Sequence, residues 1–238
     1  MLLDGAHLVA TALDAKLALH HVMVAADAAT SQEITTIVTH AYARHVPVDT
    51  ASASVMDAVS PVKSPSPILA LAERPAADET ALAHTTDGFV LVACDVQDPG
   101  NLGAIARVAD AAGAMALLVT GQSADPFGWK ALRGSMGSLL RLLTMRIATT
   151  EDAVAMLRRA GFRIAATSPR EGRSLFAANL RGRLAILVGG EGSGLPPALV
   201  ASADERLTIP MADGVESLNV AVAAALFAYE AHRQHNSV

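Results

Sequence analysis

Hydrophobic residues recur along this chain with two periods that alternate. Apolar residues three or four positions apart predict helices, and short continuous apolar runs predict buried strands. In the first third, these patterns predict a helix over 6–17, a strand over 21–25, a helix over 31–44 and a strand over 46–48. Residues 55–72 then predict a helical turn, a loop with several prolines and a further strand. This alternation indicates a small α/β domain.

A second domain is expected after a stretch that shows neither period. Residues 75–86 are small and polar, so we predict domains over 1–75 and 87–238 with a linker over 76–86. In the second domain strands are predicted near 89–94, 116–120, 163–167, 184–188 and 207–209, and helices over 102–112, 151–160 and 218–234. The economical fold class is α/β, with a mostly parallel sheet covered by helices on both faces.

The amino-acid composition excludes several classes of protein. Of the 238 residues 52% are apolar and 17% charged, which excludes a disordered or fibrous chain and indicates an aliphatic core. The single cysteine, Cys94, cannot form an internal disulfide, and the eight histidines show no metal-ligand spacing, so no metal is expected. The chain has no apolar run of membrane-spanning length and no signal-like start, so we expect a cytoplasmic protein without membrane contact.

The charge is unevenly distributed. A net charge of −5 argues mildly against a nucleic-acid partner, yet residues 130–183 hold eleven Lys and Arg against three acids. If this cluster forms one face, RNA affinity should fall steeply with salt. Scattered, solvated helix faces are the alternative. The candidate RNA contacts are Arg133, Arg141, Arg170 and Arg173.

Two loops that follow predicted strands carry polar or glycine-rich sequence where ligands of a parallel sheet gather. In the first, over 95–110, Asn101 can cap a helix, and Arg107 lies off the buried stripe. Pairing of Arg107 with Asp110 is the alternative to a functional role. The second, over 187–196, has glycines that let backbone approach a ligand, but it fits neither common nucleotide motif. A plain turn into a helix at Pro196 is its alternative.

A third loop, over 209–219, opens the last predicted helix. Glu216, Ser217 and Asn219 form a polar island before a wholly apolar stretch over 220–228. Ser217 acting as a simple helix cap is the alternative here.

Taken together, the segments DPGNLGAIARVADAAGA, VGGEGSGLP and IPMADGVESLNVAVAAALFAYE strongly resemble the motifs of SpoU-type (TrmH-like) RNA ribose methyltransferases of the SPOUT superfamily. ALRGSMGSLL, between the first two, is similar to the same family. The resemblance implies a deep trefoil knot in the C-terminal domain, and residues 1–75 are similar to the small ribosomal-protein-L30-like domain of relatives. It also implies S-adenosyl-L-methionine as cofactor, held by Thr167, Ser168, Gly189, Gly190, Ile209, Met211 and Leu218.

The activity implied is methyl transfer to a ribose 2′-hydroxyl of structured RNA, either rRNA or tRNA. The catalytic set carried over by resemblance is Asn101, Arg107, Glu191, Ser217 and Asn219. A guanidinium keeps its proton in a protein, so Arg107 is interpreted as a phosphate clamp that stabilises the developing alkoxide. Two alternatives are an RNA- or nucleotide-binding protein without methyl transfer, and a small-molecule methyltransferase.

A homodimer is also expected, since the cofactor pocket of relatives packs beside the last helix, and that helix is apolar over much of its circumference. The sequence pattern assigns Leu218, Ala221, Val222, Ala225 and Tyr229 to the core. It leaves Val220, Ala224, Phe227 and Ala228 for a partner.

Overall fold

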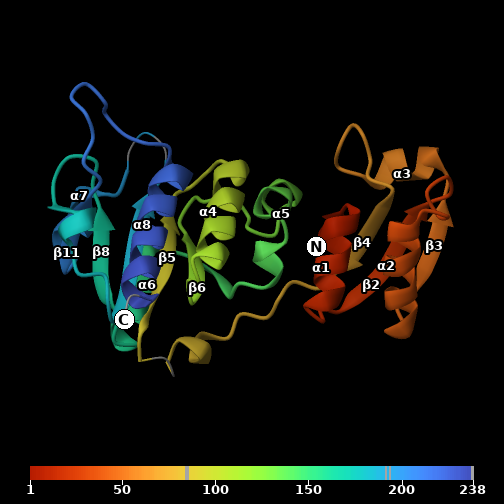
Figure 1. The fold of residues 1–238 in the computed structure, drawn as a ribbon, viewed down its shortest axis with the longest axis horizontal. Coiled ribbons are helices and arrows are strands. Elements are labelled where there is room, and N and C mark those ends of the chain that lie inside the picture. Colours follow the sequence, from red (N-terminus) through yellow and green to blue (C-terminus); the bar gives the residue numbers. More distant parts are fainter. Residues whose placement is uncertain (84–85, 191, 193, 237–238) are drawn as a thin grey trace.

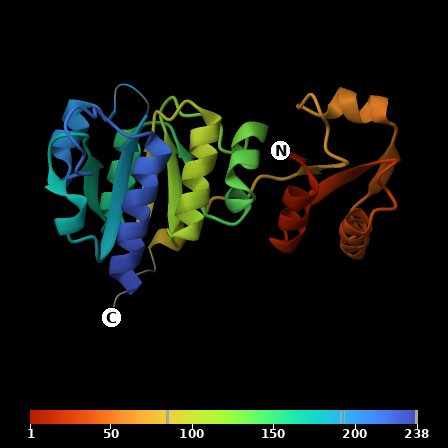
Figure 2. The ribbon, with the colours of Figure 1, turned by 45° about the horizontal axis from the view of Figure 1, so that its top comes forward.

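The structure, a computed structural model, describes residues 1–83, 86–190, 192 and 194–236. These described residues form one sheet of four strands and another of seven. Figures 1 and 2 show the two sheets in separate lobes of an elongated molecule, joined by an extended segment that follows residue 72.

The N-terminal lobe is a four-stranded sheet with the order β1-β4-β2-β3. Strand β4 is antiparallel to β1 and β2, whereas β2 and β3 are parallel. The elements are β1 (Leu2–Asp4), α1 (Ala6–Asp14), β2 (Leu19–Ala25), α2 (Gln32–Ala43), β3 (Val48–Ala51), α3 (Ala53–Val59) and β4 (Ile68–Ala72). The predicted helices and strands are present here, shifted by a few residues, and the pattern missed the three-residue β1.

The larger sheet has the order β7-β6-β5-β10-β8-β11-β9, and each neighbouring pair is parallel. This confirms the expected α/β class with a mostly parallel sheet. Its elements are β5 (Gly88–Cys94), α4 (Pro99–Ala111), β6 (Ala116–Thr120), α5 (Trp129–Ser135), β7 (Thr144–Ile147), α6 (Thr150–Arg159), β8 (Arg163–Thr167), β9 (Arg173–Ser174), β10 (Arg183–Gly189), α7 (Pro197–Ser202), β11 (Glu205–Thr208) and α8 (Val220–Asn236). The sequence pattern missed α5, β7 and β9.

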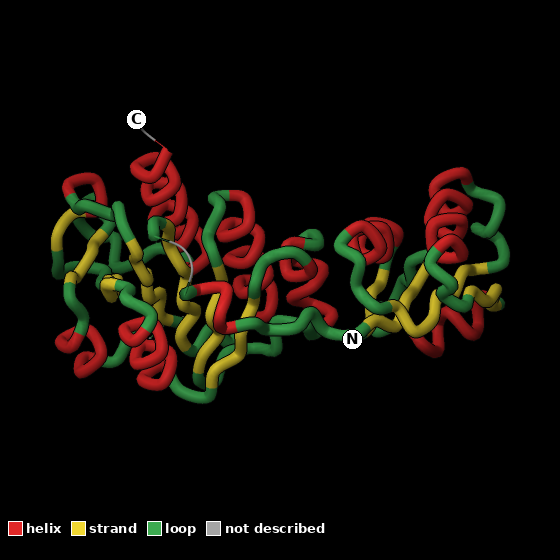
Figure 3. Tube along the Cα trace, turned by 90° about the horizontal axis from the view of Figure 1, so that it is seen from below, coloured by secondary structure: helices red, strands yellow, loops and turns green. Residues whose placement is uncertain are grey.

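Helices cover both faces of this sheet, as Figure 3 shows. Side chains of β5 alternate: Leu91 and Ala93 pack with α4, α5 and α8, whereas Val90 and Val92 pack with α6 and α7. The strands are therefore buried on both sides, which explains why their sequences read as continuous apolar runs.

The segment expected to be a linker is packed against the larger lobe. It contains a 3-10 turn, Glu79–Leu82, in which Leu82 is buried. The guanidinium of Arg183 donates hydrogen bonds to the carbonyl oxygens of Leu82 and Ala83 and stacks 4.6 Å from the centroid of Phe162. These contacts fix the turn beside the start of β10.

Helices α4 and α8, which border the first and the third loop, begin at other residues than predicted. Helix α4 starts at Pro99, and its cap is Asp98, whose Oδ1 accepts a hydrogen bond from the Asn101 amide at 2.7 Å. Proline suits the first helical position because it lacks an N–H. Asn101 is thus inside the first turn and is not the cap. Helix α8 starts at Val220 instead of residue 218.

The sides of α8 are mostly opposite to the prediction, although Ala221 is buried as predicted. Val220, Ala224, Phe227 and Ala228 are buried, although the sequence pattern assigns them to a partner. Val222 and Tyr229, assigned to the core, are 50% and 52% exposed, and Leu226 is 38% exposed. The stretch over 220–228 is apolar all round, so its composition did not mark the solvent side.

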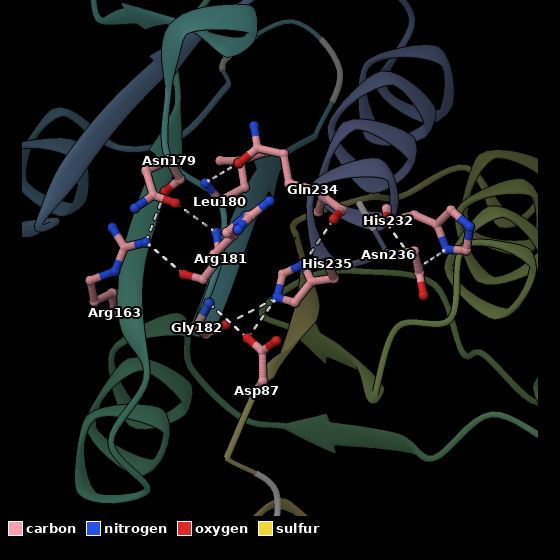
Figure 4. A network of polar contacts seen from close by, with 11 residues as sticks. Asp87, Arg163, Asn179, Leu180, Arg181, Gly182, His232, Gln234, His235 and Asn236 are labelled. Atoms are coloured by element: carbon pink, nitrogen blue, oxygen red, sulfur yellow. Dashed lines mark hydrogen bonds and ion pairs between the residues drawn. The ribbon is translucent and has the colours of Figure 1, made fainter. Parts of the chain in front are cut away.

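The far end of α8 is fixed by a polar network (Figure 4). The side chain of Gln234 accepts from the Leu180 amide at 2.9 Å and donates to the Ala178 carbonyl at 3.0 Å. His235 lies 3.2 Å from Asp87, the residue before β5. The C-terminal helix is therefore held to segments that precede both central strands.

Candidate functional site

A cavity of about 400 Å³ opens at the carboxyl ends of β8, β10 and β11. All seven residues predicted to hold the cofactor line it, namely Thr167, Ser168, Gly189, Gly190, Ile209, Met211 and Leu218. The carboxyl ends of parallel strands meet at one edge of a sheet, so loops far apart in sequence converge there.

Two glycines of the second loop occupy places that no side chain fits. A Cβ on Gly189 would lie 2.3 Å from the carbonyl carbon of Gly194, and one on Gly190 would lie 2.0 Å from the Asp95 oxygen. The Gly194 amide donates to the Gly190 oxygen at 3.3 Å, which closes the turn. The glycines therefore bring backbone against backbone at the cavity wall. Glu191, predicted to be catalytic, lies outside the described residues.

The cavity also has apolar lining residues that the sequence analysis did not predict. Val220, Ala223 and Phe227 come from α8, and Leu195 and Val200 come from the segment after the glycine loop and from α7. The spacing of the first three residues, three and four apart, could have indicated this face. A slot with an apolar wall, a backbone wall and a few hydroxyl groups suits a flat, heteroaromatic ligand.

Asn219 joins the third loop to the first. Its Oδ1 accepts hydrogen bonds from the amides of Ala221 at 2.9 Å and Val222 at 3.3 Å, so it caps α8 in place of Ser217. Its Nδ2 donates to Oδ1 of Asn101 at 3.1 Å. Ser217 lines the cavity beside it. Three of the predicted catalytic residues are thus gathered at one place.

Asn219→Ala should lower the free energy of unfolding by about 1 kcal/mol, because the amides at the start of α8 lose their acceptor. Asn219→Ser keeps an acceptor for the cap but cannot reach Asn101 in the same way, so it should restore most of that stability. Urea unfolding monitored by circular dichroism measures both variants. Equal destabilisation by alanine and serine would show that the cap is not the source of the effect.

Arg107 is exposed on α4 and does not line the cavity. It lies six residues beyond Asn101, about 9 Å along the helix axis. The alternative pairing with Asp110 is wrong: Arg141 donates to that carboxylate at 2.6 Å. Within residues 1–83, 86–190, 192 and 194–236 no hydrogen bond or ion pair involves the Arg107 guanidinium. It is therefore available to an external anion.

The four candidate RNA-contacting arginines are not gathered in one place. Arg133 is exposed on α5, next to the N-terminal lobe, whereas Arg173 belongs to β9 at the far edge of the sheet. Arg141 is paired with Asp110 and Arg173 with Glu205, while Arg170 is exposed in the loop before β9. The basic segment therefore does not form a single face.

Cys94 is buried at the end of β5, and burial raises the pKa of its thiol to about 11, although hydrogen bonds with Thr120 and Thr150 oppose the shift. The thiol is protonated at neutral pH and does not serve as a nucleophile. No cluster of three His, Cys, Asp or Glu side chains able to hold a metal ion occurs among the residues that the structure describes.

Comparison with known proteins decides the family. Residues 88–229 match the profile of the SpoU rRNA Methylase family, which is more than half of the chain. The chain belongs to this family. The matched region holds the cavity, the Asn101–Asn219 contact and Arg107.

Relatives of this SpoU-family chain are named as RNA methyltransferases. It is 36% identical over 178 residues to the 23S rRNA (guanosine(2553)-2′-O)-methyltransferase RlmP of Bacillus subtilis, covering 75% of this chain and 69% of that protein. It is 33% identical over 155 residues to the 23S rRNA (guanosine-2′-O-)-methyltransferase RlmB of Escherichia coli K12, covering 65% of this chain. The match spans 64% of RlmB and 54% of a Synechocystis relative, the uncharacterized tRNA/rRNA methyltransferase slr1673.

Solved structures of the family resemble the whole SpoU-family chain. The SpoU methyltransferase AviRb from Streptomyces viridochromogenes, in complex with AdoMet, aligns with a TM-score of 0.85 at 27% identity, over 98% of this chain and 89% of that one. An RNA 2′-O ribose methyltransferase aligns with a TM-score of 0.83 at 34% identity, over 98% and 88%. Among the described helices, none is long and apolar enough to cross a membrane.

Proposed function

We propose that this protein transfers a methyl group from S-adenosyl-L-methionine to a ribose 2′-hydroxyl of rRNA or tRNA. Family membership and the names of the relatives support the reaction class. The observation that carries the proposal is the cavity between the glycine loop and α8, which opens beside the Asn101–Asn219 contact. An rRNA or tRNA substrate also makes the cytoplasm the proposed location.

The residues present fit the cofactor. Backbone around Gly189 and Gly190 and the side chains of Thr167 and Ser168 offer polar contacts, and Phe227 offers an apolar surface for an adenine ring. When bound, the cofactor supplies an electrophilic methyl group on a sulfonium.

The chain itself must position the ribose and stabilise the oxygen that loses its proton. Arg107 suits this role because a guanidinium can hold a substrate phosphate with two parallel hydrogen bonds and can stabilise an alkoxide without giving up its own proton. The hydroxyl proton leaves to the phosphate or to water. The amides of Asn101 and Asn219 orient the substrate or Arg107, and Ser217 completes the set.

The test of this function is tritiated methyl transfer to total RNA, followed by nuclease mapping of the labelled nucleotide. Label in a 2′-O-methylated nucleotide is expected. Label in a base, or none in rRNA and tRNA alike, would contradict it.

We expect S-adenosylmethionine and its demethylated product to bind with micromolar-class affinity in the absence of any divalent ion, because backbone and apolar contacts dominate the cavity. Calorimetry with a chelator present measures this directly. No heat from either compound, or a strict requirement for a divalent ion, would contradict the assignment of the cavity.

We also propose a homodimer, formed by the exposed side of α8 and not by the side that the sequence pattern suggested. Val222, Leu226 and Tyr229 make an exposed apolar stripe, and α4 packs alongside with partly buried Val108. Arg107 is exposed on α4 and does not line the cavity of the same chain. We therefore propose that, in the dimer, Arg107 faces the cavity of the second copy.

Leu226→Glu should convert the dimer to a monomer, since a charge in the centre of an apolar interface is left without a partner. Sedimentation at micromolar concentration measures the mass. Phe176→Glu is the matched control, because Phe176 is 64% exposed elsewhere on the lobe, and the variant should remain dimeric. A monomeric wild-type protein would refute the proposal.

Two finer features of the fold belong to the proposal. We propose that the segment between β10 and α8 is threaded as a trefoil knot; the return of the chain from β11 across the sheet to α8, which packs on β5 and β10, supports this. We further propose that residues 1–75 form an L30-like domain that contacts RNA, linked through 76–86 to the catalytic domain over 87–238.

A further inference from the structure

Trp129 is the only tryptophan of the chain, and the core does not use it. It is the first residue of α5 and is partly exposed. Its neighbour Phe127 packs against the main buried cluster, but Trp129 belongs to none of the apolar clusters formed by the described residues. A partly exposed aromatic ring outside the packed clusters has surface that a ligand can contact.

The ring shares one face of α5 with two cations. Ala131, Leu132 and Ser135 are buried on one side of the helix, and helical geometry places Trp129, Lys130 and Arg133 on the other. The Lys130 Nζ lies 5.4 Å from the centroid of the indole ring. We refer to Trp129, Lys130 and Arg133 as the α5 face.

No acidic side chain neutralises this face within the described structure. Neither Lys130 nor Arg133 forms an ion pair there, and the sequence contains no Asp or Glu between Asp125 and Glu151. The nearby carboxylate of Asp125 is occupied by Arg74 at 2.7 Å. The α5 face therefore carries an uncompensated positive charge beside an aromatic surface.

Helix α5 lies between the two lobes in both Figure 1 and Figure 2. On one side it touches α4, where a Cβ on Gly103 would lie 2.6 Å from the Ala131 oxygen. On the other side, the segment that follows α5 contacts α1, because His7 Nε2 lies 3.0 Å from the Met136 oxygen. Helix α5 therefore lies between the N-terminal lobe and α4, the helix that carries Asn101.

We propose that the α5 face is a stacking platform for an unpaired base of the RNA substrate, with Lys130 and Arg133 contacting its phosphates. The proposal rests on the proposed RNA function and deepens it. Indole rings stack on any base, and neighbouring cations neutralise the backbone, which together bind single-stranded RNA with little sequence preference. A duplex has no free base surface to offer, so an unpaired segment is the ligand that this chemistry selects.

The single tryptophan makes the first experiment direct, since all indole emission of the full-length protein comes from Trp129. Titration with an unstructured RNA oligonucleotide should quench this emission with saturation, and added salt should reverse the effect. Filter binding under the same conditions reports total RNA binding. Binding without a change in emission, or equal quenching by a perfect RNA duplex or an acidic protein, would overturn the proposal.

Variants separate stacking from a structural role. Trp129→Ala should weaken binding of the oligonucleotide on the order of 10-fold, and Trp129→Phe should keep most of the affinity because it keeps an aromatic surface. Phe176→Ala, at an exposed aromatic side chain elsewhere, is the matched control and should bind normally. Arg133→Ala should weaken binding and reduce its salt dependence, whereas Arg159→Ala, on α6 across the sheet, should do neither.

Calorimetry with S-adenosylmethionine tests whether each variant is folded, because only a folded variant binds the cofactor. Unchanged oligonucleotide affinity in Trp129→Ala, with wild-type methylation intact, would overturn the platform alone. Absence of methyl transfer to any RNA by the wild-type protein would instead overturn the proposed function.

Discussion

Arg107→Ala is expected to reduce the turnover of RNA methylation on the order of 10²-fold or more, by analogy with the loss of a single donor that stabilises an oxyanion. The guanidinium is exposed and has no intramolecular partner among the described residues, so its removal should change the free energy of unfolding by less than about 0.5 kcal/mol. Single-turnover methylation of the mapped RNA at saturating cofactor measures the effect.

Three further measurements make this result specific. Cofactor affinity should stay nearly unchanged, because Arg107 does not line the cavity of its own chain and its proposed ligand is the substrate phosphate. Arg107→Lys should recover little activity, since an ammonium lacks the planar fork that holds phosphate through two hydrogen bonds. Arg159→Ala, at an exposed arginine on α6, is the matched control and should be fully active. Near-normal turnover in either Arg107 variant would defeat the role assigned to it.

Gly190→Ala is expected to weaken cofactor binding by roughly tenfold to a hundredfold. The added methyl group would lie 2.0 Å from the Asp95 oxygen and 2.8 Å from its carbonyl carbon, and both are backbone atoms that cannot rotate away. The glycine loop must move away from the end of β5, and forcing such overpacking typically costs about 1–3 kcal/mol. Calorimetry with S-adenosylmethionine and thermal unfolding measure the two consequences.

Gly192→Ala is the matched control in the same loop. Its methyl group would meet no atom within 4 Å, so the change carries only the strain of a left-handed backbone at φ +88°. We expect this variant to bind the cofactor much more tightly than Gly190→Ala. Equal affinity of the two variants would mean that backbone contact at Gly190 does not shape the cavity.

The sequence pattern located strands well where both faces are buried. The strands predicted over 116–120 and 163–167 have these bounds in the structure, because a strand packed on both sides needs a continuous apolar run. The pattern did not predict short or polar elements, such as the two-residue β9. Helix starts were displaced because several good capping residues stand close together, and Pro99 decided in favour of Asp98 over Asn101.

The candidate site was only partly predictable, for a related reason. Residues such as Thr167 and Gly190 converge because the carboxyl ends of parallel strands share an edge, and sequence can indicate that edge. The sequence could not predict which side of α8 faces the core. Val222 and Phe227 are both apolar, and only the packed structure shows that Phe227 is the buried one. The basic residues over 130–183 do not form one face for the same reason, because α5 and α6, which carry several of them, cover opposite faces of the sheet.

Helix α8 is anchored at both ends, by Asn219 beside the cavity and by Gln234 and His235 against segments that precede the central strands. Its 17 residues span about 25 Å, so it joins the ligand-binding edge of the sheet to the opposite edge. We expect a helix held in this way to open as one cooperative unit and not to fray from the cavity outward. Occupancy of the cavity should therefore slow amide hydrogen exchange along the whole helix, including backbone groups that lie far from any ligand.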